Sequence, residues 1–189
     1  SESLGSLTVE DFDRLRISNP PTITISPCSF SDYSMTKISK RRDIDVAFIA
    51  RRVPGKGFDL LQDAKPLLKG IKIFDQKTND PFGILGRSKI FVSLQEPDNY
   101  PSQSLLEAMA SECAIVATDV GNTRLLVDES CAILIPSDAN ALAKAIQYLL
   151  ESPELVTRFG AICRTKVLKE HTVAKFGNYF WHMVLKRNI

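Results

Sequence analysis

Apolar and polar residues follow two different periods along this chain. Short continuous apolar runs predict buried strands, and apolar residues three and four positions apart predict helices with one buried face. Strands are predicted at 22–26, 45–50, 71–74, 90–94, 114–118 and 131–135. After the first of them, strands alternate with helices, which is typical of βαβ units and a mostly parallel sheet with right-handed crossovers.

The predicted helices lie before, between and after these strands. They are expected at 7–15, 58–68, 81–87, 103–111 and 122–127, and three more are expected to begin near Asp138, Pro153 and Thr172. Pro66 predicts a kink or an early end of the helix at 58–68, because proline cannot donate a helical hydrogen bond. The predicted fold class is α/β: a Rossmann-like, mostly parallel sheet with helices on both faces. Residues 1–40 are expected to be a linker or remnant, and residues 41–189 to form the domain.

Composition narrows the class of protein. A chain of 189 residues that is 44% hydrophobic can bury the core of one domain or one and a half. Its net charge of +2 is too small to indicate binding to nucleic acid. No apolar run reaches the ~18 residues of a membrane span, and residues 1–4 lack the pattern of a signal peptide, so a cytoplasmic protein is expected. The four cysteines show no C-x-x-C spacing, which favours buried, reduced thiols over disulfides or a metal site.

A basic turn follows the predicted strand at 45–50 and precedes the helix at 58–68. It reads Arg51-Arg52-Val53-Pro54-Gly55-Lys56-Gly57 and offers glycines, backbone N–H groups, a helix N-terminus and cations, a combination that suits a diphosphate. The alternative is a solvated basic loop, since Lys and Arg are mostly exposed. The turn has neither the P-loop spacing nor G-x-G-x-x-G, so a dinucleotide cofactor is disfavoured.

A second polar loop follows the predicted strand at 90–94 and leads into the helix at 103–111. Loops at the carboxyl ends of parallel strands are where open α/β sheets bind ligands. The loop runs from Glu96 towards Glu107. The residues Ser104-Leu105-Leu106-Glu107 also fit a capping box, in which the glutamate bonds back to the backbone N–H of the cap residue. A ligand-binding and a capping role for Glu107 both stay open.

Residues 99–110 and 114–121 resemble the donor-binding signature of the retaining, GT-B-fold glycosyltransferases of group 1, the glycogen-synthase-like and sucrose-synthase-like family. In that family a stretch E-A-M-A leads to a strand and turn V-V-A-T-D-V-G-G, and this chain has Glu107-Ala108-Met109-Ala110 followed by 114–121. The basic turn is similar to the family's G-R-L-x-x-x-K-G, with Ala50 in place of the first glycine. The resemblance spans about residues 22–185 and covers the C-terminal, donor-binding half of such an enzyme.

The resemblance implies roles for individual residues. Arg51 and Lys56 would hold the donor's diphosphate, and Glu107 would bind the ribose hydroxyls. The family's first acidic residue falls on Asn99 here, so Asp98 is the first choice for that role and Glu96 the alternative. Catalytic roles are thus expected for Asp98, Glu107, Arg51 and Lys56. Further donor-binding residues are expected at Gly55, Asn99, Tyr100, Pro101, Ser102, Gln103, Ser104, Thr118 and Gly121.

The function implied is transfer of a sugar from a UDP-, GDP- or ADP-sugar to an acceptor hydroxyl with retention, in surface polysaccharide or glycoconjugate synthesis. A nucleoside-diphosphate sugar and a missing N-terminal acceptor-binding domain are the expected partners, with peripheral contact of the intact enzyme at the inner face of a membrane as a further expectation. No metal or cofactor is expected, and this chain alone is expected to be inactive.

One departure from the family and two other functions stay open. The family has a further strand and helix between the segments that here end at Leu68 and begin at Ile71, so the sheet is expected to lack a strand or expose an edge. A non-catalytic nucleotide-binding or assembly module on the same fold is one alternative. A GT-B-type UDP-sugar epimerase is the other, but it would need more carboxylates and a histidine at the cleft, whereas His171 and His182 lie in the helical tail.

Overall fold

The computed structural model describes residues 32–33, 36–96 and 100–181. The chain divides into a compact unit, Tyr33–Leu168, and a second unit made of Ser1–Asp32 and Lys169–Ile189. The predicted helix at 7–15 and strand at 22–26 lie outside the described residues, as do Cys28 and His182. The domain boundary expected at residue 40 stays a prediction.

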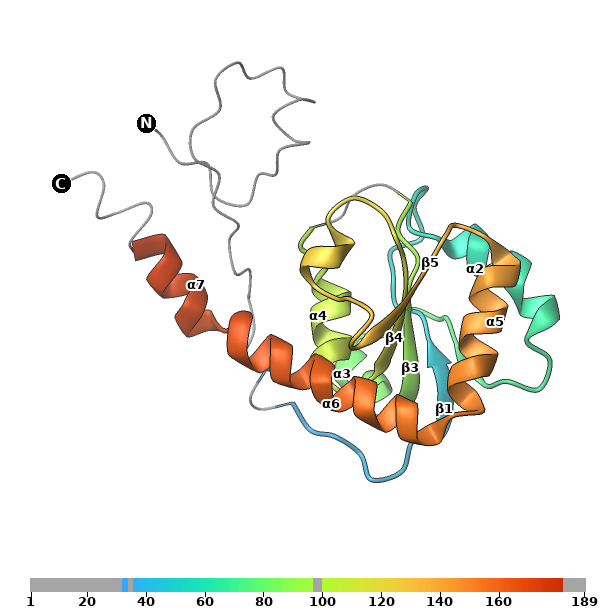
Figure 1. Ribbon diagram of the computed structural model, residues 1–189, viewed down its shortest axis with the longest axis horizontal. Coiled ribbons are helices and arrows are strands. Elements are labelled where there is room, and N and C mark those ends of the chain that lie inside the picture. The colour runs from blue at the N-terminus through green and yellow to red at the C-terminus, as the bar shows by residue number, and fades with distance from the viewer. Residues whose placement is uncertain (1–31, 34–35, 97–99, 182–189) are drawn as a thin grey trace, which may run out of the picture. The chain divides into compact units, whose positions relative to one another are not determined.

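A five-stranded, all-parallel sheet with the order β2-β1-β3-β4-β5 forms the centre of the compact unit (Figure 1). Its strands are β1 (Ile44–Ala47), β2 (Ile73–Phe74), β3 (Ser88–Ser93), β4 (Ala114–Thr118) and β5 (Ala132–Ile135). The predicted parallel α/β sheet is confirmed. The strand predicted at 45–50 ends earlier, at Ala47, because the chain leaves the ladder for the basic turn after Phe48 donates its N–H to the Phe74 carbonyl at 2.8 Å.

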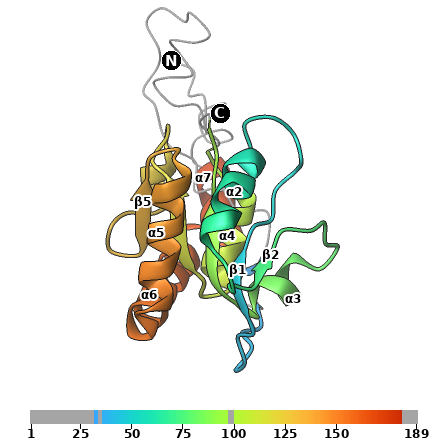
Figure 2. The same cartoon turned by 90° about the vertical axis from the view of Figure 1, so that its right-hand side faces the viewer.

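Helices cover both faces of the sheet, as the sequence predicted (Figures 1 and 2). One face carries α2 (Phe58–Ala64), the short 3-10 helix η2 (Lys65–Leu67) and α5 (Ala139–Leu150), and the other carries α3 (Pro81–Leu85) and α4 (Gln103–Ala110). The 3-10 helix η3 (Thr123–Leu125) precedes β5, and α6 (Pro153–Glu170) contributes to the core on both faces. In the second unit the described helix is α7 (Val173–Phe180), part of the one predicted from Thr172.

Local sequence explains where the helices begin and end. The early end predicted at Pro66 is confirmed, since α2 stops at Ala64 and the proline lies in η2. Asp138 caps α5 as predicted, accepting the Ala141 N–H at 2.8 Å. His171 is buried in the turn between α6 and α7.

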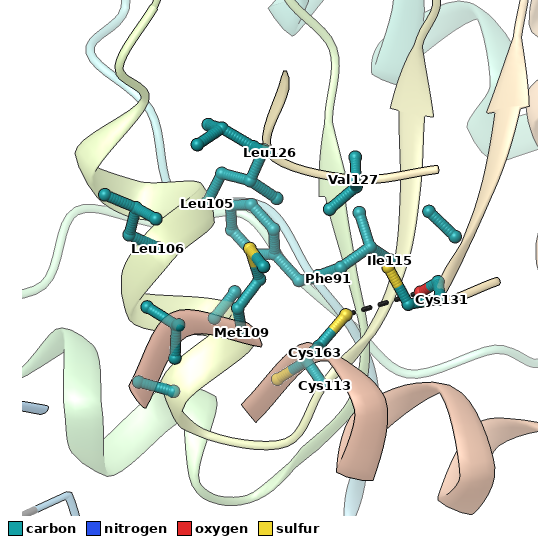
Figure 3. Packing of buried hydrophobic residues seen from close by; sticks show 14 of the residues in the cluster. Phe91, Leu105, Leu106, Met109, Cys113, Ile115, Leu126, Val127, Cys131 and Cys163 are labelled. Atoms are coloured by element: carbon teal, nitrogen blue, oxygen red, sulfur yellow. Dashed lines mark hydrogen bonds between the residues drawn. The ribbon is translucent and has the colours of Figure 1, made fainter. Parts of the chain in front are cut away.

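Two apolar clusters lie on the two faces of the sheet. Alternate residues of a strand point to opposite faces, so Phe91 joins the cluster with Leu105 and Met109 of α4, whereas its neighbours join the cluster with α2 and α5 (Figure 3). The predicted buried thiols are confirmed at Cys113, Cys131 and Cys163. The Cys163 thiol donates to the Cys131 carbonyl at 3.3 Å.

The chain passes from η2 to β2 without a further helix or strand. Gly70, with a φ of +83°, forms the turn, and β2 then pairs directly with β1, Val46 opposite Ile73. β2 is therefore a two-residue strand at one edge of the sheet. Such a short edge offers little backbone for another chain to pair with.

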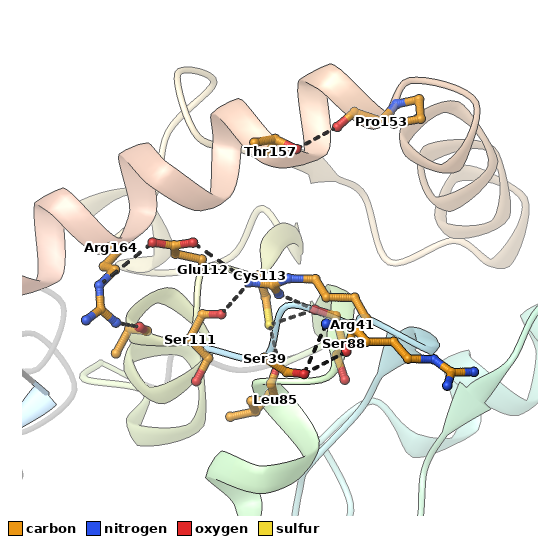
Figure 4. A network of polar contacts seen from close by, with 12 residues as sticks. Ser39, Arg41, Leu85, Ser88, Ser111, Glu112, Cys113, Pro153, Thr157 and Arg164 are labelled. Atoms are coloured by element: carbon orange, nitrogen blue, oxygen red, sulfur yellow. Dashed lines mark hydrogen bonds and ion pairs between the residues drawn. The ribbon is translucent and has the colours of Figure 1, made fainter. Parts of the chain in front are cut away.

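An ion-pair network closes the amino ends of β3 and β4 (Figure 4). Arg42 donates to the Ser88 carbonyl and, at 3.0 Å, to the Ser111 carbonyl. Glu112 lies 3.9 Å from Arg42 and 3.8 Å from Arg164. Glu112 has a φ of 57° in the Schellman turn that ends α4, where Cys113 N–H bonds to the Ala108 carbonyl at 3.1 Å.

Candidate functional site

The candidate site lies where the strand order reverses. β1 is flanked by β2 on one side and β3 on the other, and ligands of open α/β sheets bind outside the carboxyl ends of the strands at such a switch point. A cleft of about 500 Å³ opens there. Three segments line it: the turn after β1 (Ile49, Ala50, Arg51, Lys56), the segment after β2 (Gln76, Lys77, Thr78), and the connection from β3 into α4 (Gln95, Pro101, Ser102, Gln103, Ser104, Glu107).

The cations of the basic turn divide into two kinds. Lys56 donates to the Gln95 side-chain oxygen at 3.0 Å, and burial together with the nearby charge of Arg51 lowers the pKa of Lys56. The Arg51 side chain is exposed and forms no hydrogen bond or ion pair with the described part of the chain. Arg52 instead donates to the Asp75 carbonyl at 2.9 Å and lies 4.1 Å above the Phe58 ring. Arg51 and Lys56 therefore line the cleft, whereas the contacts of Arg52 stabilise the turn.

Gly57 fixes the turn against the end of β3. It has a φ of +74° and precedes α2, and a Cβ at this position would lie 1.9 Å from the Leu94 carbonyl oxygen. No L side chain fits this approach, which explains the glycine. The Glu96 N–H donates to the Gly55 carbonyl at 3.0 Å, so the loops after β1 and β3 are joined by backbone as well.

The start of α4 corrects one of the two interpretations of Glu107. The helix begins at Gln103 with Ser102 as its N-cap, so Ser104 lies inside the first turn. The capping box predicted for Ser104 and Glu107 is therefore wrong, because it needs the serine at the cap position. The Glu107 carboxylate instead accepts from the Gln103 amide at 3.2 Å, and Gln103 also donates to the Tyr33 hydroxyl at 3.1 Å.

Glu107 is a half-buried carboxylate in the wall of the cleft. Burial raises its pKa above the ordinary value, and the hydrogen bond from Gln103 opposes that shift only in part. Within the described residues it forms no ion pair. A half-buried carboxylate with one hydrogen bond from the described residues has further acceptor capacity, which suits it to accept bonds from ligand hydroxyl groups.

The structure does not bring all the expected residues to the cleft. Thr118 is buried, and its hydroxyl donates to the Gln95 carbonyl and, at 3.4 Å, to the Ser93 carbonyl, so it supports the end of β3. Gly121 is exposed in the turn after β4 and does not line the cleft. Gly55 and Glu96 border a separate hollow of about 250 Å³.

The remaining expected site residues are Tyr100, Asp98 and Asn99. Tyr100 borders a small hollow next to the cleft, which it shares with Ser102. Asp98 and Asn99 lie outside the described residues, so the choice between Asp98 and Glu96 stays a prediction. The expected residues that meet in the cleft are Arg51, Lys56, Pro101, Ser102, Gln103, Ser104 and Glu107.

Sequence reasoning missed the segment Gln76–Thr78 and Gln95. The segment follows β2, and the carboxyl ends of parallel strands meet at one edge of a sheet, so its polar residues carried a usable signal. Gln95 follows β3 directly and is buried. It is the acceptor that orients Lys56.

The fold and the cleft define a Rossmann-like α/β domain with a basic cleft at its switch point. Residues 37–152 match the family described as Glycosyl transferases group 1, and the chain belongs to this family. A search of curated protein sequences finds no match.

Solved structures show the same fold at low sequence identity. Sucrose-phosphate synthase from Thermosynechococcus elongatus superposes with a TM-score of 0.82 and 18% identity, over 98% of this chain and 58% of that one. HepE from Anabaena, solved with UDP-glucose, gives 0.72 and 15%, over 87% and 57%. The C-terminal domain of LpcC from Francisella tularensis gives 0.64 and 16%, over 76% of this chain and 99% of that domain.

The share of each solved structure that the chain covers differs between whole enzymes and an isolated domain. It spans 58% of the length of the synthase and 57% of HepE, but nearly all of the isolated LpcC domain. The chain thus has the size and fold of a C-terminal GT-B domain. Across the described residues, no helix combines the length and apolar character needed to cross a membrane.

Proposed function

We propose that this chain is the donor-binding domain of a retaining glycosyltransferase and that its cleft takes the nucleoside diphosphate of a nucleotide-sugar. The observation that carries the proposal is the meeting of Arg51, Lys56 and Glu107 in one cleft at the switch point. Two cations held close together favour a diphosphate. The half-buried carboxylate favours the paired hydroxyl groups of a ribose.

The proposed chemistry follows from this placement. The bond between the sugar C1 and the diphosphate oxygen breaks, and its electron pair stays on the diphosphate. Arg51 and Lys56 stabilise the charge that develops there. The acceptor oxygen forms the new bond to C1 on the same face, and its proton passes to the leaving phosphate. The acceptor would be bound by the N-terminal half of the intact enzyme.

The structural neighbours support a UDP-sugar as the first donor to test. HepE was solved with UDP-glucose, and another neighbour is a sucrose-phosphate synthase. A role in surface polysaccharide or glycoconjugate synthesis, at the cytoplasmic face of a membrane, belongs to the same proposal. It comes from the resemblance and not from the cleft.

A binding-only module is the second candidate. Asn99 occupies the place of the family's first acidic residue, and an amide cannot supply the negative charge of a carboxylate near the sugar. In that case the chain would bind the nucleotide and the intact protein would transfer no sugar. Turnover of a nucleotide-sugar by the intact protein separates the two candidates.

Titration of this chain with UDP, GDP and ADP tests the binding step. A ligand at a hundredfold excess over Kd stabilises the folded state by about 2.7 kcal/mol, so the melting temperature should rise. Arg51→Ala and Lys56→Ala should each weaken diphosphate binding roughly tenfold to a hundredfold, the size of a charge-assisted hydrogen bond. Nucleoside binding should change less.

A matched control and a contrary result complete the test. Lys144→Ala removes an exposed cation from α5, outside the cleft, and should leave every Kd unchanged. Equal losses for nucleoside and diphosphate would mean that the turn supports the fold and does not bind phosphate. Sugar transfer by this chain alone would contradict the division into donor and acceptor halves.

A further inference from the structure

Tyr33 is a buried tyrosine at the point where the chain enters the compact unit. It is the first residue of that unit, is only 1% exposed, and belongs to the apolar cluster that contains Leu105 and Leu106 of α4. Its hydroxyl oxygen accepts a hydrogen bond at 3.1 Å from the amide of Gln103, which lies 70 positions further along the chain. Tyr33 does not line the cleft. An effect of its hydroxyl on a ligand must therefore pass through another residue.

Gln103 joins Tyr33 to Glu107. It is the first residue of α4, and Glu107 lies four residues further on, so the two side chains share one face of the helix. The amide nitrogen of glutamine carries two hydrogens. One is directed at the Tyr33 hydroxyl and the other at the Glu107 carboxylate, at 3.1 and 3.2 Å. The three side chains therefore form one chain of hydrogen bonds.

This chain of hydrogen bonds fixes the Gln103 amide in one orientation. If the amide were turned over, its oxygen would face the Glu107 carboxylate, and two acceptors would repel each other. The first turn of a helix frays readily, so Gln103 needs support from outside α4. The Tyr33 ring supplies a fixed point, because it is packed in the core.

Glu107 depends on this support. Within the described residues its carboxylate accepts one hydrogen bond, the one from Gln103, and forms no ion pair. Burial raises the pKa of Glu107, and the bond from Gln103 acts against that shift. The bond therefore favours the charged form of the carboxylate, which accepts hydrogen bonds from hydroxyl groups better than the neutral form does.

We propose that Tyr33 and Gln103 are positioning residues for Glu107: the Tyr33 hydroxyl holds the Gln103 amide, and the amide holds the carboxylate where it meets the ribose hydroxyls of the nucleotide. The inference rests on the proposed function, because it needs a ribose at Glu107. Nucleotide affinity then depends on the segment through which the chain enters the compact unit, although Tyr33 itself does not line the cleft.

The test is a calorimetric titration of UDP and GDP, each compared with its dideoxy analogue, which keeps the base and the diphosphate but lacks both ribose hydroxyls. The wild type should bind at least one of the two nucleotides about tenfold more tightly than its analogue. Tyr33→Phe keeps the packing of the ring and should weaken binding of that nucleotide by about threefold to tenfold, the size of one hydrogen bond. The Kd of the analogue should not change.

A second variant and a matched control sharpen the test. Gln103→Met should give the same pattern with a loss at least as large, and adding Tyr33→Phe to it should have no further effect, because both changes break the same chain of bonds. Tyr148→Phe removes the hydroxyl of an exposed tyrosine on α5 and should behave as the wild type. If Tyr33→Phe did not fold, as judged by thermal unfolding, Gln103→Met would carry the same comparison.

Four results would contradict the inference. Equal losses for nucleotide and analogue in Tyr33→Phe would indicate a general effect on the fold and overturn the proposal. Unchanged nucleotide affinity, or losses from the two substitutions that add, would overturn it as well. Equal binding of nucleotide and analogue by the wild type would mean that Glu107 does not bind ribose, and would leave diphosphate binding by Arg51 and Lys56 intact. Failure of the wild type to bind UDP, GDP or ADP would reject the proposed function too.

Discussion

Charged side chains are paired with one another at the amino end of the parallel sheet, whereas two of the cations that line the cleft at the carboxyl end lack partners of opposite charge among the described residues. At the amino end, Asp43 accepts two bonds from Arg87, at 2.9 and 2.6 Å, and Asp45 pairs with Lys89 at 2.6 Å. At the carboxyl end, the cleft holds Arg51 and Lys77 without a carboxylate partner among the described residues. Among the described residues that line the cleft, Glu107 is the one carboxylate, and it accepts a hydrogen bond from a neutral amide.

The difference separates charges that hold the fold from charges kept for a ligand. Paired charges stabilise the folded state modestly, more so when they are partly buried. Unpaired charges in a half-buried cleft cost stability until an ion of opposite sign arrives. Replacing an unpaired charge at the carboxyl end is thus expected to raise stability and to lower function, whereas replacing a paired charge at the amino end is expected to lower stability.

Two glycines support the two ends, and replacing either should have the largest effect. Gly57→Ala should destabilise by about 3 kcal/mol or more, since a Cβ would lie 1.9 Å from the Leu94 oxygen. Gly160→Ala should cost a similar amount, because its Cβ would lie 2.2 Å from the Glu112 oxygen. Urea unfolding measures both. Gly70→Ala is the control: φ is also positive but nothing lies within 4 Å, so a cost equal to that of Gly57→Ala would refute the steric argument.

Thr118→Val should produce the next largest effect. It leaves the shape of β4 unchanged but removes the hydroxyl that bonds to the Gln95 carbonyl at the rim of the cleft. The expected cost is about 1–3 kcal/mol, the penalty for an unsatisfied buried group. Nucleotide affinity should fall only slightly, because Thr118 does not line the cleft. A large loss of affinity at unchanged stability would instead restore Thr118 as a donor-binding residue.

Two glutamates at opposite ends of the sheet give the sharpest form of the comparison. Glu112→Gln should lower the unfolding free energy by up to about 1 kcal/mol, because it removes two ion pairs at the surface. Glu107→Gln should raise it at neutral pH, since burial penalises this carboxylate, and should weaken nucleotide binding. Thermal unfolding and calorimetry of both variants test the contrast. Loss of stability in both would mean that Glu107 is a structural residue.

Acidification should change the free energy of unfolding in opposite directions through the carboxylates at the two ends of the sheet: those at the amino end lose their stabilising effect, whereas Glu107 at the carboxyl end becomes more favourable. The hydrogen bond from Arg87 lowers the pKa of Asp43 to about 2. For Asp45, burial acts to raise the pKa, but bonds from Lys89 and the Lys72 N–H outweigh it and the pKa is lowered. A lowered folded-state pKa gives stability above the ordinary value of 3.8 that disappears as pH falls towards 2.

The pKa of Glu107 is shifted in the opposite direction to that of Asp43. Its pKa is raised by burial, so the folded state favours the protonated form, and the wild type gains stability from this residue as pH falls from neutrality towards 4.5. Denaturant titrations at several pH values should therefore show the advantage of Glu107→Gln shrinking on acidification. The deficit of Asp43→Asn should vanish near pH 2. Parallel pH profiles for the wild type and both variants would contradict this assignment.

The sequence predicted the strands well because their signal is local. Each strand after residue 40 contains a short apolar run, and helix ends are marked by the Asp138 side chain, which caps α5, and by Pro66, which has no N–H to donate. The predicted start of α4 at residue 103 is confirmed, but the capping-box interpretation put the cap at Ser104, since Ser102 and Ser104 both suit a cap and only the fold chooses between them.

The site was predicted only where chain neighbours are also spatial neighbours. Arg51 and Lys56 share one turn, and Ser102 to Glu107 share one helix start. Lys77 was missed because its place in the cleft depends on β2 pairing with β1, a long-range fact. Thr118 was assigned to the ligand because a pattern does not tell which way a hydroxyl points, and here it points to the Gln95 carbonyl.

The all-parallel sheet also has a kinetic consequence. Val46 pairs with Ile73 on one side and Ile90 on the other, so the central strand gains both neighbours only after long segments of chain have been brought back. The entropy cost of closing these long loops comes before the distant contacts can stabilise the chain. Domains dominated by such contacts therefore fold in milliseconds to seconds. During that time the apolar run of β3 has no partner strand, which makes the half-assembled sheet, and not the finished one, the form of this domain most prone to aggregate.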